Sequence, residues 1–506
     1  MQVTEIQSIL PWLVFLVPLG FSIPILTLGR RHKVFREWVS LAGLFVTLAV
    51  TLVIYRQIIS SRELKALIWR GWLYLDGLSL LMQFLVTIMA IIIVLYSTKY
   101  LAKEAPGNSI SEGRLSLYYG LLLLFVGLMN WSCVVNSLIM LYILLEASTL
   151  VTVYLVAFDW QRKSIEAGFK YYLLITVGMI FSLVAAILLY WVSGTGPVLS
   201  LSTLGTRVPE IPRTIALLCC GLFIVGYGTK AGLMPFHAWL PDAHAEAPAP
   251  ISVLLSGVII KMGAYALART VTVFAPHYRE IVIFIAIIGS VTMILGIIMA
   301  LAQDDLKRLL AYSSVSEMGF IVAGLGLGTY LGLFGGLFHL VNHAIMKGLL
   351  FFCAGALLYA AGTRKISELR LIPKKMVMTG FCFFVGALAI GGMPPFNGFL
   401  SSLTLFLALG KSDLFWASII LIAASFLTVV ALVWAGYRIF WTKPIPGLVP
   451  VTANPGAKNA QEVPSLMGGG MLFLAILCLL FGVYPQAIYP LLDSAAKGVL
   501  AISAAP

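Results

Sequence analysis

Five ionisable side chains lie inside long apolar stretches of this sequence, where such groups are costly and usually functional. They are Glu146, Lys230, Lys261, Glu317 and Lys347. Lys261 stands near the middle of SVLLSGVIIKMGAYALA, and a lysine at the centre of a membrane-spanning helix costs about 2.5–3.5 kcal/mol. It is retained either as a structural lysine paired with a helix-break carbonyl or an acid, or because it carries ions. For Glu146, a structural ion pair with a lysine of another helix is compatible with a functional role.

Lys230 lies in FIVGYGTKAGLMPFHAWLPDAHAEAPAP, where Gly, Pro and polar residues interrupt an apolar helix. A broken helix exposes backbone carbonyls, which are tolerated at membrane depth only when they are buried in protein or face water. Burial or a nearby cation makes a lysine ammonium easier to deprotonate, and a proton relay needs such a group. The alternative is a proline-kinked span with a lysine that reaches toward the membrane surface.

A stripe of polar residues crosses another apolar run, FHLVNHAIMKGLLFFCAGAL. His339, His343 and Lys347 are spaced by four residues, so successive members lie about 40° apart around a helix and about 6 Å apart along it. Histidine titrates nearest to neutral pH, which favours a proton path. Two histidines at this spacing could also bind a metal, but no third ligand is evident. A structural polar stripe that faces a partner helix is the remaining alternative.

The composition assigns the whole chain to the membrane. Of its 506 residues, 60% are hydrophobic and 10% are charged, whereas soluble domains carry about 25% charged residues. Apolar runs of about 20 residues, long enough to span a bilayer, recur from Pro11 onward. We predict an all-α integral membrane protein with about fourteen transmembrane helices, forming one polytopic domain over residues 1–506. A transmembrane β-barrel is excluded because its strands are about 10 residues long and alternate in polarity.

The distribution of charges predicts the topology. The net charge of +13 does not indicate nucleic-acid binding, because most basic residues occupy short loops between spans. When the loops are assigned alternately to two sides, one side carries 20 Lys and Arg and the other carries 10. The positive-inside rule places the first side in the cytoplasm and both termini on the outer side. The six cysteines show no CxxC spacing, so we expect no metal site and no cofactor.

Two similar helix breaks predict an internal repeat. GLMPFHAWL begins at Gly232 and GGMPPFNGFL begins at Gly391, and these segments fall in the seventh and twelfth predicted spans, five apart. Inverted repeats with matched broken helices mark the transport path in many transporters. We therefore predict two inverted five-helix repeats, approximately residues 112–272 and 278–442.

Four motifs resemble the antiporter-like subunits shared by complex I (its M and N subunits), Mrp-type sodium/proton antiporters (the D-type subunit) and energy-converting membrane-bound hydrogenases. They are LYILLEASTL around Glu146, the segments Gly228–Arg269 and Asp305–Phe320, and HLVNHAIMKGLLFFCAGAL from His339. The resemblance covers roughly residues 75 to 445. It implies a prokaryotic plasma-membrane protein that works beside other membrane subunits, further antiporter-like subunits among them, and a peripheral arm that carries clusters.

The resemblance also implies functional residues. The central hydrophilic axis of such subunits corresponds here to Glu146, Lys230, Lys261, His339, His343 and Lys347. Glu146 and Lys230 are expected to form a switchable ion pair, whose opening pushes a proton toward Lys261 and the histidines.

This sequence departs from the family pattern at two positions. In the twelfth span, Ser402 stands where relatives carry a lysine or glutamate, and Glu317 stands where they usually carry Gln or His. Glu317 is either a half-hydrated structural acid near the cytoplasmic end of its helix or a substitute for the missing charge. Glu317, Ser402 and His244 are therefore additional candidate residues.

Three functions remain open at this point. The first is a proton- or sodium-translocating subunit of a redox-driven membrane complex, such as a hydrogenase or a related oxidoreductase. The second is a subunit of a stand-alone Mrp-type antiporter, and the third is a structural copy that does not pump, for which Ser402 is the argument. No nucleotide fingerprint or metal-ligand cluster indicates a redox site in this chain. The expected partners are other membrane subunits and lipid, without nucleic acid.

Overall fold

The structure is a computed structural model that describes residues 4–6, 8–30, 33–61, 65–68, 71–102, 110–193, 200–369, 376–441 and 460–503. Several basic residues that entered the topology prediction lie outside the described residues: Arg31, Arg62, Arg70, Lys103, Arg370, Lys374, Lys375, Lys443 and Lys458.

Thirteen stretches of helix in the described part are long and apolar enough to cross a membrane. Twelve of them are single helices: α1 Leu10–Leu28, α2 Lys33–Ser61, α3 Gly77–Tyr100, α4 Glu112–Ser132, α5 Leu138–Val156, α6 Arg162–Ser193, α8 Arg213–Ala231, α12 Arg279–Leu301, α13 Leu306–Gly326, α14 Tyr330–Ala361, α18 Phe415–Phe440 and α20 Ser465–Val483. The thirteenth consists of α10 Ala249–Leu254, a π-helical turn at Leu255–Ile259 and α11 Ile260–Phe274. The shorter helices α16 Val377–Ile390 and α17 Asn397–Lys411 supply the two halves of one further span, in agreement with the fourteen predicted.

Polar residues at the helix starts define where several spans begin. Each of them accepts a hydrogen bond from a backbone N–H in the first turn, which otherwise has no partner within the helix. These N-caps are Asp76 for α3, Ser111 for α4, Ser137 for α5, Asp305 for α13 and Thr329 for α14. In each of these spans, at least one backbone amide of the first helical turn therefore has a side-chain hydrogen-bond partner.

Both predicted helix breaks are present. α8 ends at Ala231 and α9 begins at Trp239, while α16 ends at Ile390 and α17 begins at Asn397. At each break a glycine, Gly232 or Gly392, has a positive φ angle, which glycine adopts without steric cost. Its N–H bonds to the carbonyl three residues earlier, and the next N–H bonds to the carbonyl five residues earlier. The two breaks therefore share their hydrogen-bond pattern, and the inverted relation of the surrounding repeats stays a prediction.

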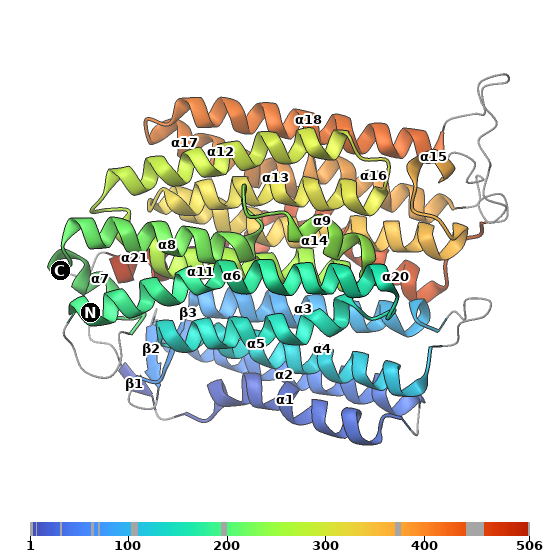
Figure 1. The fold of residues 1–506 in the computed structure, drawn as a ribbon, viewed down its shortest axis with the longest axis horizontal. Coiled ribbons are helices and arrows are strands. Elements are labelled where there is room, and N and C mark those ends of the chain that lie inside the picture. The colour runs from blue at the N-terminus through green and yellow to red at the C-terminus, as the bar shows by residue number, and fades with distance from the viewer. Residues whose placement is uncertain are drawn as a thin grey trace.

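A small sheet accompanies the helices. β1 (Thr4–Ile6) pairs in parallel with β2 (Lys65–Ile68), which pairs antiparallel with β3 (Leu73–Asp76). The last helix, α21 (Tyr489–Ser503), packs against the start of α3. Both ends of the described chain thus lie at the same end of the bundle (Figure 1). The remaining elements are short: α7 Leu204–Arg207, α9 Trp239–Glu246, α15 Ile366–Leu369 and 3-10 turns at Val208–Glu210 and Pro485–Ala487.

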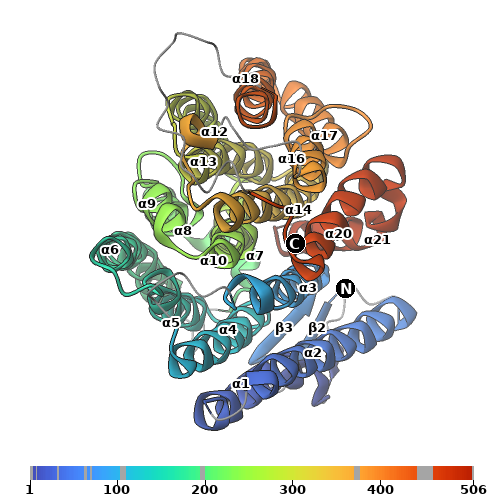
Figure 2. The same cartoon turned by 90° about the vertical axis from the view of Figure 1, so that its right-hand side faces the viewer.

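α14 lies near the centre of the bundle seen end-on (Figure 2), packed against α10, α13, α16, α17 and α20. The span that comprises α10 and α11 is wholly buried, and α13 is nearly so. By contrast, α6 and α18 expose apolar side chains such as Leu173, Val177, Phe426 and Trp434 on their outer faces. Polar groups along α10–α11, α13 and the inner face of α14 are therefore held away from lipid.

Three basic residues that we counted among the loop charges are buried instead, which corrects that part of the sequence interpretation: Arg36, Arg269 and Lys307. Arg269 forms a two-pronged ion pair with Asp76, with nitrogen–oxygen distances of 2.6 Å for both contacts. Its guanidinium also lies 5.3 Å from the ring centre of Tyr74 and 5.1 Å from that of Tyr265. Lys307 is only 1% exposed, and its ammonium donates to the Ala247 carbonyl. These residues join neighbouring elements and do not face solvent.

Replacing Arg269 with Leu should destabilise the fold strongly, because it leaves the Asp76 carboxylate buried without a counter-charge. Breaking a buried pair in this way costs about 3–5 kcal/mol, so the thermal unfolding midpoint of the purified protein should fall clearly. Arg213→Ala is the matched control, since Arg213 pairs with Glu280 on the exposed surface, where ion pairs contribute little. Equal losses in the two variants would contradict the role assigned to the buried pair.

Candidate functional site

The candidate residues gather in the enclosed core of the bundle. Seven of them have no solvent exposure: Lys230, His244, Lys261, Glu317, His339, His343 and Lys347. Glu146 is half-buried, and Ser402 is 9% exposed. An apolar environment of this kind is unfavourable for charge, so the hydrogen-bond partners of each group determine which protonation states it can hold.

Lys230 occupies the last turn of α8, just before the helix break. Its ammonium reaches across to α5, where it donates to the Leu145 carbonyl at 2.9 Å and to the Thr149 hydroxyl at 2.8 Å. The Ser148 hydroxyl lies farther away, at 3.4 Å. All of these acceptors are neutral.

The predicted ion pair between Glu146 and Lys230 is not formed in this structure. Among the described residues, no carboxylate oxygen lies within 4.0 Å of the Lys230 ammonium. That ammonium does bind the carbonyl of Leu145, the residue before Glu146. Glu146 instead accepts a hydrogen bond of 2.8 Å from Thr176 of α6, and its second oxygen is buried without a partner. Hydroxyl groups of α5 and α6 bind the two side chains separately in this conformation, and the expectation that Glu146 and Lys230 form a switchable pair stays a prediction.

Lys261 is the second residue of α11 and lies two positions after the π-helical turn. Its ammonium donates to the Ser256 carbonyl within that turn and contacts Nδ1 of His343 on α14. A lysine ammonium can only donate, so Nδ1 of His343 must accept while the lysine is protonated. The second ring nitrogen of His343 is buried without a partner. This contact joins α11 to the polar stripe predicted on α14.

Lys347 points from α14 to α13. Its ammonium donates to the Leu310 carbonyl at 3.0 Å and contacts the Ser313 hydroxyl. Lys230, Lys261 and Lys347 therefore share one pattern: each binds one backbone carbonyl together with a hydroxyl or an imidazole, and none binds a carboxylate. Neutral acceptors stabilise an ammonium less than a carboxylate does, so these lysines are not locked in the charged form.

Glu317, one of the additional candidates, forms a close contact with the stripe. Its Oε2 lies 2.7 Å from Nε2 of His339, and Nδ1 of His339 lies 3.0 Å from the Ser401 hydroxyl on α17. Phe320 stacks on the His339 ring with ring centres 5.5 Å apart. The second oxygen of Glu317 is buried without a partner. The structure thus places Glu317 in a buried contact with the stripe, whereas the alternative that we left open was a half-hydrated acid.

The other two additional candidates make fewer polar contacts. His244 on α9 stacks on Phe351 with ring centres 4.5 Å apart, and neither of its ring nitrogens has a hydrogen-bond partner. The Ser402 hydroxyl is likewise buried without a partner. The adjacent Ser401, which sequence reasoning did not single out, makes the contact with His339.

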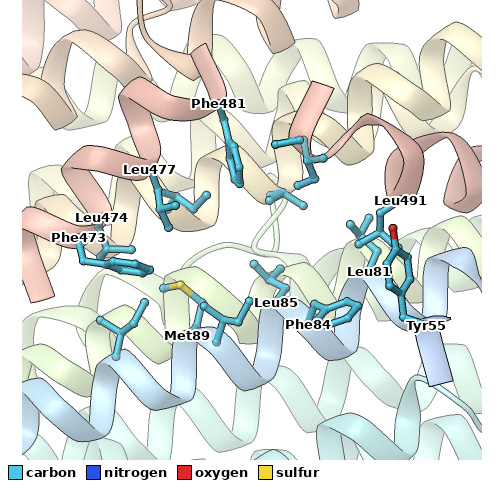
Figure 3. Close-up of a pocket in the computed structure, with 16 residues that line it drawn as sticks. Tyr55, Leu81, Phe84, Leu85, Met89, Phe473, Leu474, Leu477, Phe481 and Leu491 are labelled. Atoms are coloured by element: carbon cyan, nitrogen blue, oxygen red, sulfur yellow. The ribbon is translucent and has the colours of Figure 1, made fainter. Parts of the chain in front are cut away.

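The opposite face of α14 is apolar and borders a cavity of about 320 Å³. Val341 and Ile345 contribute to its lining, two residues before and after His343 and hence about 160° around the helix from it. Figure 3 shows that the side chains of α3 and α20, among them Met89 and Phe473, close this space. Its lining, taken from the described residues, contains no charged group. α14 therefore separates an apolar space from the polar contacts.

Hydroxyl residues are the part of the site that sequence reasoning missed. Ser148, Thr149, Thr176, Ser313 and Ser401 all bind a candidate ionisable group. Ser148 and Thr149 follow Glu146 by two and three residues within an apolar run, which was a usable signal. Over the described ranges, no group of three or more His, Cys, Asp or Glu residues is arranged to hold a metal ion.

The family described as "NADH:quinone oxidoreductase/Mrp antiporter, TM" matches residues 135–428, and "NADH-Ubiquinone oxidoreductase (complex I), chain 5 N-terminus" matches residues 72–108. NADH-quinone oxidoreductase subunit N of Desulforudis audaxviator is 31% identical over 95% of this chain and 96% of its own length. Hydrogenase-4 component B of Escherichia coli is 31% identical, with 83% of this chain and 63% of the relative covered. Na(+)/H(+) antiporter subunit A1 of Staphylococcus haemolyticus is 33% identical, with 93% and 60% covered.

Two solved structures show the same fold at lower identity. A chain of the Mrp complex from Dietzia sp. DQ12-45-1b superposes with a TM-score of 0.85 at 20% identity, covering 98% of both chains. A chain of an archaeal membrane-bound sulfane sulfur reductase gives 0.87 at 24% identity, covering 98% of this chain and 99% of that one.

Gly263→Ala should disturb the site by separating α8 from α11. A Cβ atom at Gly263 would lie 2.5 Å from the backbone nitrogen of Ala231 and 2.7 Å from the Tyr227 carbonyl, both on α8. Backbone must move to relieve such overlap, so we expect a loss of about 1–3 kcal/mol in unfolding free energy and slower transport. Gly221→Ala is the control, because nothing lies within 4 Å of its Cβ. The measurement is the thermal unfolding midpoint of both variants. An unchanged midpoint in Gly263→Ala would show that α8 and α11 can move apart without loss of stability.

Proposed function

Because this chain belongs to the family of NADH:quinone oxidoreductase and Mrp antiporter membrane subunits, we propose that it is the proton-translocating subunit of a multisubunit, redox-driven membrane complex. One observation carries the proposal. Three lysines are fully buried in the enclosed core, and each is held by neutral acceptors. A buried lysine with a carboxylate partner would be a structural ion pair, whereas one that is bound only by neutral groups can lose its proton and regain it.

The proton enters this scheme at Lys230. The Lys230 ammonium rests on the carbonyl of Leu145, one residue from Glu146. A movement of these side chains that brings the carboxylate and the ammonium together would hold the proton on Lys230. When the contact opens, as in the present conformation, the ammonium loses its counter-charge and can release its proton more easily. Glu146 and Lys230 thus act as a two-state pair.

Lys261 receives the proton and passes it to α14. Its contact with Nδ1 of His343 offers a direct acceptor, and Lys347 and His339 lie one turn away on either side of that histidine. Nitrogen groups of this kind carry protons, whereas hard cations such as sodium prefer oxygen ligands. The geometry therefore favours the proton over sodium.

A stand-alone antiporter is the second candidate, favoured by the similarity to the Staphylococcus antiporter subunit. This chain spans 60% of that relative, so the relative holds further segments that have no counterpart here. The two candidates differ in their partners, because only the redox-driven complex needs subunits that carry clusters. Isolation of the intact complex and identification of its subunits and iron content would decide between them.

Lys261→Ala should abolish proton translocation and leave the complex assembled. The variant removes a relay group but also removes the cost of burying a cation, so stability should not fall. Translocation is measured as pH change in vesicles that contain the intact complex, with assembly followed on native gels. Lys411→Ala, at the exposed end of α17, is the control and should behave as the natural protein does. A disassembled complex with normal translocation per remaining particle would make Lys261 structural.

We further propose that the protein is a multi-pass component of a prokaryotic plasma membrane with both termini on the outer side. The loop charges support this orientation, and the two ends of the described chain lie together.

The six natural cysteines are all buried, so single introduced cysteines can be labelled selectively. In whole cells, a membrane-impermeant maleimide should label His277→Cys, and it should reach Lys163→Cys only after the cells are permeabilised. The reverse pattern would invert the topology.

A further inference from the structure

Glu317 stands apart from the other buried acid of this protein. Among the described residues, Asp76 and Glu317 are the fully buried carboxylates. Asp76 is neutralised by the Arg269 guanidinium, whereas the partner of Glu317 is the imidazole of His339, which is itself titratable. The charge of the Glu317–His339 pair can therefore change by one unit inside the core.

The hydrogen-bond geometry fixes one proton of this pair. Nε2 of His339 and Oε2 of Glu317 are 2.7 Å apart, and two acceptors that face each other at this distance would repel. A proton must therefore lie between them. The net charge of the pair therefore depends on whether the other ring nitrogen, Nδ1, is protonated.

Ser401 faces Nδ1 and has a choice of hydrogen-bond partners. Its oxygen lies 3.0 Å from Nδ1 of His339, 3.1 Å from the Gly398 carbonyl and 3.3 Å from the Asn397 carbonyl. A hydroxyl carries a single hydrogen. It either donates to an unprotonated Nδ1, or turns to a carbonyl and accepts a hydrogen bond from a protonated Nδ1.

We propose that Glu317, His339 and Ser401 form a one-proton store whose occupancy controls the buried lysines. In the empty state, Glu317 is a carboxylate, Nε2 holds the ring proton and the Ser401 hydroxyl donates to Nδ1, so the store carries one negative charge. On loading, a proton from water on the α17 side binds the Ser401 oxygen. The original O–H bond of Ser401 then breaks as an N–H bond forms at Nδ1. The loaded store has no net charge.

The change of charge couples the store to the rest of the site. Glu317 is within electrostatic reach of both Lys261 and Lys347, and His343 lies next to His339 with ring centres 6.4 Å apart. The empty store stabilises protons on these lysines and on His343, and the loaded store withdraws that support. Proton uptake beside α17 therefore drives proton release from the lysines. This coupling rests on the proposed function.

α17 is the element beside the store that lies at the edge of the bundle (Figure 2). Its outward side chains include the exposed Leu403 and Leu407, while Ser401 itself is buried. Its two hydroxyls differ in their contacts, since Ser401 binds His339 while the Ser402 hydroxyl has no partner. This difference supplies a matched pair of variants on adjacent residues.

The test compares Glu317→Gln, Ser401→Ala and Ser402→Ala in vesicles that contain the intact complex. Glu317→Gln keeps the size and an acceptor oxygen of the side chain but fixes its charge at zero, and Ser401→Ala removes the hydroxyl that contacts Nδ1. Both should slow proton translocation about a hundredfold, the scale of a lost proton-transfer group, with assembly unchanged. Ser402→Ala should retain the natural rate, and Ser401→Thr, which restores the hydroxyl, should regain translocation.

Two outcomes would overturn the store. One is a normal rate in Glu317→Gln or Ser401→Ala, and the other is a loss in Ser402→Ala as large as that in Ser401→Ala. A rise in translocation per electron in Ser402→Lys would also contradict it, because the α17 side would then have been closed in the natural protein. If Lys261→Ala abolishes translocation while these variants do not, the proposed function stands and the store fails. If Lys261→Ala has no effect, the proposed function itself fails.

Discussion

A protonated amine that is buried in an apolar helical bundle must find its hydrogen-bond acceptors within the protein. Much of the architecture around the site answers this requirement. The acceptors include the backbone carbonyls of Leu145, Ser256 and Leu310. Serine and threonine hydroxyls also donate to the carbonyls of Leu145 and Leu310. The carbonyl of Ser256 belongs to an irregular helical turn, and Lys230 approaches α5 from the last turn before a helix break. Irregular backbone is thus found where the buried charge must be solvated.

The same requirement explains how the helices are distributed. α10–α11, α13 and α14, which carry Lys261, Glu317 and Lys347, are enclosed by other helices, while α6 and α18 present apolar faces outward. The Asp76–Arg269 pair holds the start of α3 to the end of α11, the helix that carries Lys261. The close approach of Gly263 to α8 adds a second fixed contact along α11. Lys261 needs such fixed neighbours, because a shift of α11 would separate its ammonium from His343 of α14.

Sequence reasoning recovered the spans, both helix breaks and the positions of the buried lysines, because apolar runs, Gly–Pro interruptions and charges within helices are local signals. It did not recover which side chains these charged groups contact. The expected contact of Lys230 with Glu146 is replaced by Thr149 and Leu145, and Arg269 is buried although it follows an apolar run as a loop residue would. Which side chains meet depends on the rotation and depth of one helix relative to another, and packing sets both. The contact of Glu317 with His339 joins residues 22 positions apart on two helices, and nothing in the local pattern of either helix encodes it.

The cavity beside α14 gives that helix a mechanical asymmetry. Its polar face is tied to α11, α13 and α17 by hydrogen bonds, while Val341 and Ile345 on its other face border a space of about 320 Å³. A turn of the helix that pulls His339 or His343 away from its partner would move apolar side chains into this space and not into packed neighbours, so it would lose few dispersion contacts. α14 therefore has space beside its apolar face, and a small apolar solute bound in that space would restrict such a rotation.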